Sequence, residues 1–368
     1  PSSRLSQKTR DAMGQQAIAL ARAVNYRSAG TVEFIVGVDE DFYFLEMNTR
    51  LQVEHPVTEL VHNVDLVSLM IQISAGKTLD LTQDQVKATG WAVEARIYAE
   101  DSVRGFLPST GQLRKYKEPA IDKIRIDSGV SEGSHIAMFY DPMIAKIIAY
   151  GKDRKTAISE LSHALDRYQI NGVETNIQFL NAILLDKDFI AGNITTAFID
   201  EKFGGKFVPL KPDSKLEKRL LALATAILTP VVLQAYPTKP SKAENILQIS
   251  NGDNYLAEWQ YFENTHIVTL GSEQYEVTGQ ISNSMSLFAG QINGKSLPVK
   301  INRNYHKVTL ETGPYRIDVN ILPAVAEKLI GLMPAPNAFG GGLKVRAPMP
   351  GMLTKLLISE GDILFVGQ

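Results

Sequence analysis

Polar and apolar residues alternate along the segment Phe42–Glu59, FYFLEMNTRLQVEHPVTE. Successive even positions carry charged or amide side chains, namely Glu46, Asn48, Arg50, Gln52 and Glu54. Side chains of an extended chain alternate between its two faces, so this set would share one face. The apolar odd positions, and the leading residues Phe42 and Phe44, suggest that the segment is half-buried. A half-buried polar row is costly unless a ligand satisfies it. The segment therefore predicts a strand with a binding site along its polar face.

Length and composition indicate a globular chain of two or three domains. It has 368 residues, of which 44% are hydrophobic and 21% charged. The formal net charge of -2 argues against non-specific nucleic-acid binding, and no apolar run reaches the length of a membrane span. The absence of Cys excludes a disulfide framework and thiolate catalysis, which agrees with a reducing compartment.

Helical and strand patterns mix in residues 1–205, which predicts an α+β unit. Helices are expected at residues 6–26 with Ser6 as cap, at 65–75 ended by Gly76, at 154–168 after the cap Asp153, and at 175–185. The runs Gly30–Val36 and Phe42–Asn48 flank GVDED and predict an antiparallel hairpin, and Ala92–Asp101 predicts a further strand.

The pattern changes after the Gly- and Pro-containing linker Gly204–Ser214. Leu216–Leu228 predicts an apolar helix that Pro230 should stop. Short alternating strands follow over residues 255–322, and the Asn293-Gly294 pair is typical of tight hairpins. One helix followed by many strands predicts a small barrel or curled antiparallel sheet packed on that helix.

A flexible linker, MPAPNAFGGG, separates this region from the last segment of the chain. Beyond it lie a few expected strands and Gly turns, in a segment of roughly 25 residues that is too short to form a core alone.

The expected hairpin brings Glu33 and Glu46 face to face. Two facing carboxylates repel each other, and a divalent cation between them reverses that penalty. Asn48 would add a neutral oxygen, and such a small all-oxygen set suits Mg²⁺ or Mn²⁺ bound with phosphates and water. Arg50 offers a planar fork for a small oxyanion, and a nearby carboxylate could act as a general base. The alternative for the Glu pair alone is a solvated hairpin face.

The same stretch resembles the signature of biotin carboxylases, which have an ATP-grasp fold. The residues that carry the resemblance are EFIV followed by YFLEMNTRLQVEHPVTE. The similarity continues through WAVEARIYAED, GFLPSTG, FYDPMIAKIIAYGKDR and NGVETNIQFL, and so covers residues 1–203.

The resemblance implies a role for each matching residue. Glu33, Glu46 and Asn48 correspond to the Mg²⁺ or Mn²⁺ ligands that bridge the ATP phosphates. Arg50, Gln52 and the Val53 backbone correspond to the bicarbonate cradle, and Glu54 to the base that deprotonates bicarbonate. Arg96 corresponds to the arginine that stabilises the biotin enolate, Phe106 to a wall for the biotin rings, and Ile35 to the adenine pocket.

Several of these residues also have a purely structural explanation. Arg96 could pair with Glu94 or Glu100 in its own strand, and Phe106 and Ile35 could simply pack. His55, which precedes Pro56, is interpreted as structural, its ring nitrogens fixing the loop.

The chain opens at Pro1 without Met and stops within an apolar pattern, so we expect it to be a piece of a longer polypeptide. The family's Gly-rich phosphate loop and nucleotide-binding lysines would lie upstream. The segment APMPGMLTKLLISEGDILFVGQ resembles the first half of a biotinyl carrier domain, whose biotin-bearing Lys would lie beyond Gln368. We therefore expect these 368 residues alone to be inactive in biotin-dependent ATP cleavage.

Residues 211–333 resemble the domain that joins biotin carboxylase to carrier in acyl-CoA carboxylase α subunits. In that family the domain is a helix wrapped by a β-barrel, and it docks on the carboxyltransferase β subunit. The segments YRIDVNILP and LIGLMP are most similar to propionyl-CoA carboxylase, with the 3-methylcrotonyl-CoA enzyme as the alternative. Pyruvate carboxylase is disfavoured, because no segment is long enough for an intervening TIM-barrel domain. A β scaffold without any partner remains the structural alternative.

The expected domains are a partial ATP-grasp domain (1–90), a biotin carboxylase C-terminal domain (91–205), a carboxyltransferase-docking domain (211–333), a linker (334–342) and a truncated carrier domain (343–368). The expected function is ATP- and bicarbonate-dependent carboxylation of biotin on the protein's own carrier domain, within a hetero-oligomer. Two alternatives stay open: another ATP-grasp ligase that makes acyl phosphates, and a docking module. The expected compartment is the cytoplasm for a bacterial source and the mitochondrial matrix for a eukaryotic one.

Overall fold

The computed structural model describes most of the chain up to position 323 and a few residues beyond it. The described residues are 2, 4–204, 207–233, 241–249, 253–282, 285–304, 306–323, 329, 352 and 355–360. The chain divides into two units, Pro1–Ala324 and Val325–Gln368. In the second unit, residues 352 and 355–360 form neither helix nor strand. The expected linker and most of the expected carrier segment lie outside the described residues.

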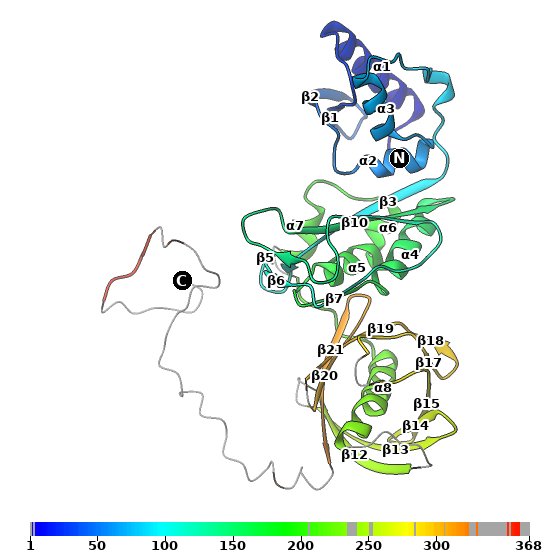
Figure 1. The fold of residues 1–368 in the computed structure, drawn as a ribbon, viewed down its shortest axis with the longest axis vertical. Helices are drawn as coiled ribbons and strands as arrows, with labels where there is room; N and C mark the ends of the chain where they lie inside the picture. The colour runs from blue at the N-terminus through cyan, green and yellow to red at the C-terminus, as the bar shows by residue number, and fades with distance from the viewer. Residues whose placement is uncertain are drawn as a thin grey trace. The chain divides into compact units, whose positions relative to one another are not determined.

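The first part of the larger unit holds helices around a hairpin (Figure 1). Its elements are α1 (Gln7–Ala23), β1 (Thr31–Val36), β2 (Phe42–Asn48), α2 (His55–His62), α3 (Leu66–Ser74) and the 3₁₀ turn η1 (Gln83–Gln85). The expected cap of α1 is confirmed, because the Ser6 hydroxyl accepts a hydrogen bond from the Thr9 N–H. The expected antiparallel hairpin is confirmed as β1 paired with β2.

The apolar face expected along β2 is wrong for three residues. Tyr43, Phe44 and Leu45 are 65%, 49% and 52% exposed. The reason is that β1 and β2 form a two-stranded sheet, which in the described part of the chain is joined by no further strand. Two strands alone cannot bury both sides of a sheet.

Helix α2 was not expected from the sequence, and it fixes where the alternating segment ends. Pro56 lies in its first turn, where proline needs no amide hydrogen. Val57 and Val61 pack against Ala92 of β3 and Ile148 of β10, so the helix rests on the next sheet. The helix ends at Asn63, which adopts a left-handed conformation with φ of 53°.

The central sheet is antiparallel and three-stranded, in the order β3-β10-β8. Its strands are β3 (Trp91–Tyr98), β8 (Ile124–Ser128) and β10 (Met143–Gly151). Short strands flank it: β4 (Glu100–Asp101), β5 (Leu107–Pro108), β6 (Gly111–Gln112), β7 (Lys115–Lys117), β9 (His135–Ile136) and β11 (Gln169–Asn171). The helices are α4 (Arg154–Leu165), α5 (Ile177–Leu185), α6 (Lys187–Ala191) and α7 (Phe198–Phe203). The core joins fully buried Ile97 and Ile147 to Leu161 of α4.

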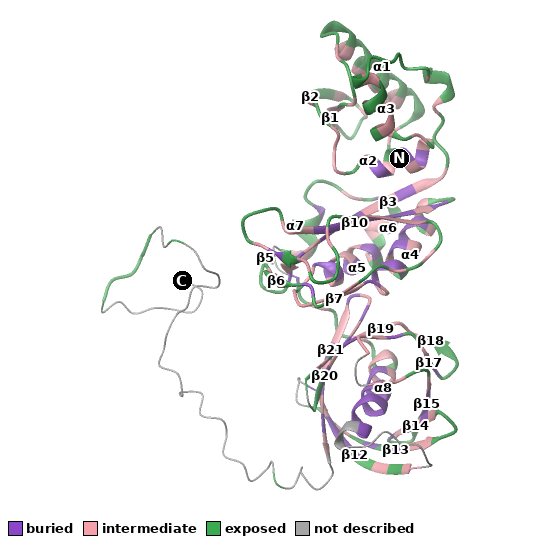
Figure 2. Ribbon diagram, in the orientation of Figure 1, coloured by how far each residue is buried: buried purple, intermediate pink, exposed green. Residues whose placement is uncertain are grey.

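From residue 214 to residue 323, a ten-stranded antiparallel sheet curls around one helix. The helix is α8 (Ser214–Val232), and Figure 2 shows it buried along most of its length. The strands are β12 (Ser241–Ile249), β13 (Asn254–Phe262), β14 (Thr265–Leu270), β15 (Glu273–Thr278), β16 (Leu287–Phe288), β17 (Gln291–Ile292), β18 (Lys295–Ser296), β19 (Val299–Asn304), β20 (Lys307–Thr312) and β21 (Tyr315–Pro323). The expected helix wrapped by a curled sheet is thereby confirmed.

Two local expectations in this region had different outcomes. Asn293 and Gly294 have φ values of 52° and 69° and turn the chain between β17 and β18, as expected. Pro230 does not stop α8, because the Leu233 N–H still donates to the Thr229 carbonyl at 3.0 Å beyond it. A proline inside a helix costs about 3 kcal/mol, and burial of the helix within the sheet offsets that cost. Among the described helices, none is long and apolar enough to cross a membrane.

Candidate active site

The hairpin brings the two expected carboxylates face to face. Glu33 pairs with Glu46 in the register of β1 and β2. Asn48 Nδ2 lies between them and donates to Glu33 Oε1 at 2.7 Å and to Glu46 Oε1 at 3.2 Å. The amide group thus takes the place of a positive charge between two anions.

This donor set fits a divalent cation. Two carboxylates and an amide that can turn its oxygen inward are ligands that Mg²⁺ and Mn²⁺ accept. Within the described residues, no group of three or more His, Cys, Asp or Glu side chains is arranged to hold a metal ion. A cation at the hairpin would therefore use Asn48 and oxygens from outside the chain.

The polar row does not continue as a strand beyond Asn48, and this part of the expectation is wrong. Arg50 lies at a bend, and Val53 and Glu54 form a turn that leads into α2. The physical reason is the helix that starts at His55. These residues form a loop, Arg50–Glu54, which contacts the hairpin at two points. Gln52 Nε2 donates to Glu33 Oε1 at 3.1 Å, and Arg50 Nη2 donates to Asn48 Oδ1 at 3.3 Å.

Glu54 meets Arg96 at the end of this loop. Arg96 Nη2 lies 2.8 Å from Glu54 Oε2, while its Nε lies 3.9 Å from Glu94 Oε1. Glu54, 42 positions away in sequence, is therefore a closer partner of Arg96 than Glu94 in its own strand. The side chains of Arg96 and Glu54 are 39% and 50% exposed, so the pair is open to small solutes and contributes little to stability.

Glu94 lies beside this pair, and from the sequence it was expected only as a possible ion-pair partner of Arg96. Its side chain is 6% exposed, and neither carboxylate oxygen has a hydrogen-bond partner. Burial raises the pKa of Glu94 to about 7, against the opposing influence of Lys146 and Arg96. The available signal was its position two residues before Arg96, which puts both side chains on one face of β3.

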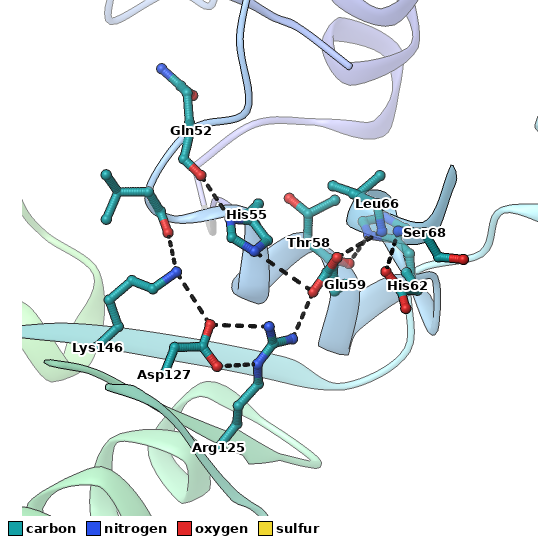
Figure 3. Close-up of polar contacts among 12 residues, drawn as sticks. Gln52, His55, Thr58, Glu59, His62, Leu66, Ser68, Arg125, Asp127 and Lys146 are labelled. Atoms are coloured by element: carbon teal, nitrogen blue, oxygen red, sulfur yellow. Dashed lines mark hydrogen bonds and ion pairs between the residues drawn. The ribbon is translucent and has the colours of Figure 1, made fainter. Parts of the chain in front are cut away.

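A row of ionic contacts connects the loop to the central sheet (Figure 3). Lys146 Nζ donates to the Val53 carbonyl at 2.8 Å and lies 3.3 Å from Asp127 Oδ2. Arg125 holds Asp127 with two hydrogen bonds of 2.8 and 3.0 Å, and it reaches Glu59 Oε2 of α2 at 2.6 Å. The signal that sequence reasoning missed was a lysine within the apolar run MIAKIIAYG.

His55 has the structural role expected for it. Its Nδ1 lies 2.8 Å from the Gln52 carbonyl oxygen.

Ile35 is 58% exposed on β1, opposite Tyr43. Phe106 packs edge-on against Phe179, with ring centroids 4.9 Å apart, in a cluster of aromatic residues. These contacts of Ile35 and Phe106 involve neither Glu54 nor Arg96.

A polar cavity of about 280 Å³ lies elsewhere in the larger unit. Its lining includes Asp166, Asn181, Lys300 and Glu311, and it contains none of the residues of the loop or the hairpin. The cavity therefore does not bear on the chemistry of the Glu54–Arg96 pair.

Three family models match successive segments of the chain. Residues 1–82 match the carbamoyl-phosphate synthase L chain, ATP binding domain. Residues 94–201 match the biotin carboxylase C-terminal domain, and residues 234–335 match the propionyl-coenzyme A carboxylase BT domain.

Similar proteins match over the whole chain or over its first half. The chain is 36% identical to the mitochondrial propionyl-CoA carboxylase alpha chain of Caenorhabditis briggsae, with all of this chain and 53% of that protein covered. It is 32% identical to the mitochondrial methylcrotonoyl-CoA carboxylase subunit alpha of Dictyostelium discoideum, again over all of this chain and 55% of that protein. The chain thus spans about half the length of these curated relatives.

A solved structure supports the same assignment for the first half. It is the biotin carboxylase domain dimer of Hydrogenobacter thermophilus 2-oxoglutarate carboxylase, in complex with MgADP, ADP and bicarbonate. The TM-score is 0.54 at 41% identity, over 55% of this chain and 44% of that one.

Proposed function

Since the chain belongs to the family of biotin carboxylases, we propose that it takes part in ATP- and bicarbonate-dependent carboxylation of biotin. The observation that carries this proposal is the ion pair of Arg96 with Glu54, two residues after Gln52, whose side chain bonds Glu33 in the cluster of Glu33, Glu46 and Asn48. One loop thus connects a carboxylate that can act as base, the guanidinium paired with it, and oxygens that can bind a metal, which are the groups that carboxylation of biotin requires.

In the proposed reaction Glu54 removes the proton of bicarbonate, so that a bicarbonate oxygen attacks the γ-phosphate of ATP and ADP leaves. The carboxyphosphate formed decomposes to CO₂ and phosphate. The phosphate takes the proton from N1 of biotin, and the biotin enolate then attacks CO₂. Arg96 stabilises the negative charge of that enolate.

The remaining residues of the loop and hairpin bind and orient. Arg50 presents a planar fork to bicarbonate, and the Gln52 side chain and Val53 backbone complete the cradle. Glu33, Glu46 and Asn48 would hold Mg²⁺ or Mn²⁺, which when bound neutralises charge on the ATP phosphates. We further assign Ile35 to the adenine pocket and Phe106 to a wall of the biotin site. The exposure of Ile35 agrees with a ligand-facing position.

The biotin itself would be attached to a carrier-domain lysine outside this chain. We propose the domain division 1–90, 91–205, 211–333, 334–342 and 343–368, of which 211–333 would dock on a carboxyltransferase β subunit in a hetero-oligomer. Propionyl-CoA is the proposed acceptor of the carboxyl group, supported by the alpha-chain relative. The proposed compartment is the mitochondrial matrix for a eukaryotic source and the cytoplasm for a bacterial one, as relatives of both kinds exist.

Two other functions have specific support. The Dictyostelium discoideum relative favours 3-methylcrotonyl-CoA as acceptor, and comparing the two acyl-CoA substrates separates this from the first proposal. The match of residues 1–82 to an ATP binding domain of carbamoyl-phosphate synthase favours another ATP-grasp ligase. Such a ligase would cleave ATP without regard to biotin.

The proposal is tested by bicarbonate-dependent ATP hydrolysis, with and without free biotin, on the protein at its natural length. We expect biotin to stimulate hydrolysis. Glu54→Gln should lower kcat by about 10²- to 10⁴-fold, because it removes the base but keeps the shape. Glu46→Gln should in addition raise the KM for MgATP.

Glu132→Gln is the matched control for Glu54→Gln. It removes a half-exposed carboxylate that lies 3.7 Å from Lys115 in the same part of the chain. We expect its kcat to be unchanged. Normal turnover in both Glu54→Gln and Glu46→Gln would show that these residues do not have the proposed roles, and hydrolysis indifferent to biotin would favour the other ligase.

A further inference from the structure

Lys146 is a buried cation in the middle of the central strand of its sheet. Its neighbours in sequence, Ala145 and Ile147, are buried, and its own side chain is 11% exposed. It pairs with Arg96 on one side and with Asp127 on the other. Burying an ammonium group is costly, and the neighbouring Arg96 adds repulsion. An apolar side chain would satisfy this position more cheaply, so packing alone does not explain the lysine.

The Lys146 ammonium contacts the backbone of the loop at Val53. Its hydrogen bond to the Val53 carbonyl, at 2.8 Å, spans 93 positions of sequence. That carbonyl belongs to the peptide group that begins Glu54. Because a peptide group is planar, holding its oxygen also fixes the orientation of the Glu54 N–H and of the chain that carries the carboxylate.

The preceding peptide group is held in the same way. The Gln52 carbonyl accepts a hydrogen bond from the His55 N–H at 3.2 Å, and His55 Nδ1 lies 2.8 Å from it. In a trans peptide the N–H points opposite to the C=O, so this contact directs the Val53 N–H to the other side. Two successive peptide groups at the end of the loop therefore have fixed orientations.

A series of hydrogen bonds and ion pairs leads from Lys146 to α2 and α3 (Figure 3). Asp127 is held by Arg125, and Arg125 also bonds Glu59. Glu59 Oε1 in turn accepts the Leu66 N–H at 2.7 Å, at the start of α3. Burial raises the pKa of Asp127, but the hydrogen bonds from Arg125 and Lys146 outweigh this and leave the pKa below its ordinary value. The Asp127 carboxylate therefore stays charged and keeps its ion pair with Lys146.

We propose that Lys146 is a positioning residue for bicarbonate, which holds the loop Arg50–Glu54 in its binding conformation and is itself held by Asp127 and Arg125. This inference rests on the proposed function, because it takes the loop as the bicarbonate cradle. Lys146 acts through the Val53 carbonyl and takes no part in the transfer of protons or phosphate.

The test is steady-state ATP hydrolysis by Lys146→Met at varied bicarbonate, on the protein at its natural length. We expect the KM for bicarbonate to rise by about ten- to a hundredfold, since a small displacement of binding groups has effects of that size. The KM for MgATP should stay within about twofold of the unmodified protein, because the hairpin ligands do not contact Lys146. Lys146→Arg keeps a donor for the Val53 carbonyl and should restore most of the bicarbonate affinity.

Arg154→Met is the matched control. Arg154 Nη2 donates to the Phe189 carbonyl at 2.7 Å, so this variant also removes a cation that bonds a backbone oxygen, but on α4. It should lower the melting temperature without changing the KM for bicarbonate. If Lys146→Met does not fold, Asp127→Asn replaces it, with a smaller rise in the same KM expected.

The outcomes separate the two proposals. Biotin-stimulated hydrolysis in the unmodified protein with an unchanged bicarbonate KM in Lys146→Met would overturn the positioning role alone. An equal rise in Arg154→Met would overturn it too, because the effect would then reflect general loss of structure. Absence of bicarbonate-dependent hydrolysis in the unmodified protein would overturn both.

Discussion

At the scale of single residues, Glu94 is the most informative side chain next to the candidate site. Its carboxylate is buried and has no hydrogen-bond partner, and burial raises its pKa to about 7 from an ordinary value of 4.5. A raised pKa in the folded state means that the folded protein binds the proton more tightly than the unfolded chain. The stabilisation from this proton is complete below pH 4.5 and is lost as the pH rises through 7.

We predict that Glu94→Gln removes this pH dependence. From pH 5.5 to pH 8 the stability of the variant should rise by about 2 kcal/mol relative to that of the unmodified protein, since about 1.5 pH units below the folded pKa correspond to that free energy. Urea unfolding at pH 5.5 and pH 8 measures the change, with the surface variant Glu132→Gln as control. A difference that is equal at the two pH values would show that Glu94 does not titrate in this range.

The sequence was sufficient to predict the site residues that lie close together along the chain. The alternation in β2 predicted that Glu46 and Asn48 share a face, and the hairpin placed Glu33 opposite. Sequence alone did not predict Lys146 or Asp127, because their contacts with the loop depend on tertiary packing of segments far apart in the chain. Strand β10 pairs with both β3 and β8, and this pairing brings Lys146 next to Arg96 and Asp127. No local sequence pattern predicts which strands pair.

At the scale of secondary-structure elements, local sequence signals predicted helix starts correctly where a nearby side chain accepts a hydrogen bond from the backbone N–H groups of the first turn. The caps of α1 and α4, at Ser6 and Asp153, were predicted from hydroxyl and carboxylate side chains just before a helical pattern. Helix α2 and strand β12 were missed. The eight residues of α2 are held by packing on β3 and β10, and helices this short are unstable alone.

A second prediction concerns the curled sheet around α8. His266 of β14 is buried, and its Nδ1 accepts a hydrogen bond from Trp259 Nε1 at 3.0 Å. Burial lowers the pKa of His266 from 6.5 to about 4. Above pH 6.5 the imidazole is neutral in both states and has no effect. As the pH falls from 6.5 towards 4, His266 becomes protonated in the unfolded chain but stays neutral in the folded protein. The free energy of unfolding therefore decreases, by about 2 kcal/mol at pH 5.

His266→Phe should therefore change the pH profile of unfolding. At pH 7.5 the variant should be less stable by about 1–3 kcal/mol, because the Trp259 N–H loses its acceptor. At pH 5 this deficit should be smaller by about 2 kcal/mol, as measured by urea unfolding monitored through tryptophan fluorescence. His163→Gln, at an exposed position, is the control and should give a constant difference. A deficit that stays constant for His266→Phe would contradict the buried neutral imidazole.

At the scale of the whole molecule, the family resemblance predicted more than any local pattern. The α+β first part and the helix within a curled sheet are both confirmed, and the matches to biotin carboxylase and BT domains agree with the resemblance stated from the sequence. Residue types and their spacing predicted which side chains meet in the hairpin, but the contacts that connect one region to the next leave no such local pattern.

One such contact lies between the end of α4 and the turn that joins β20 to β21. Asp166 Oδ1 accepts hydrogen bonds from Asn181 Nδ2 at 2.9 Å and from the Gly313 N–H at 3.0 Å. Gly313 has a φ of 55°, which favours glycine in this turn. The carboxylate therefore connects the region of the central sheet to the curled sheet within the larger unit.

We predict that Asp166→Ala weakens this connection while leaving the chemistry intact. Two donors lose their acceptor, at a cost of about 1–3 kcal/mol, so hydrogen exchange at the Gly313 amide should become faster. ATP hydrolysis with free biotin should be unchanged, because Asp166 contacts none of the loop or hairpin residues. Asp188→Ala, which removes a half-exposed partner of Lys202, is the control and should not alter exchange at Gly313. Unchanged exchange in Asp166→Ala would mean that the turn is held by its own strands, and a loss of hydrolysis would mean that the curled sheet supports the active site.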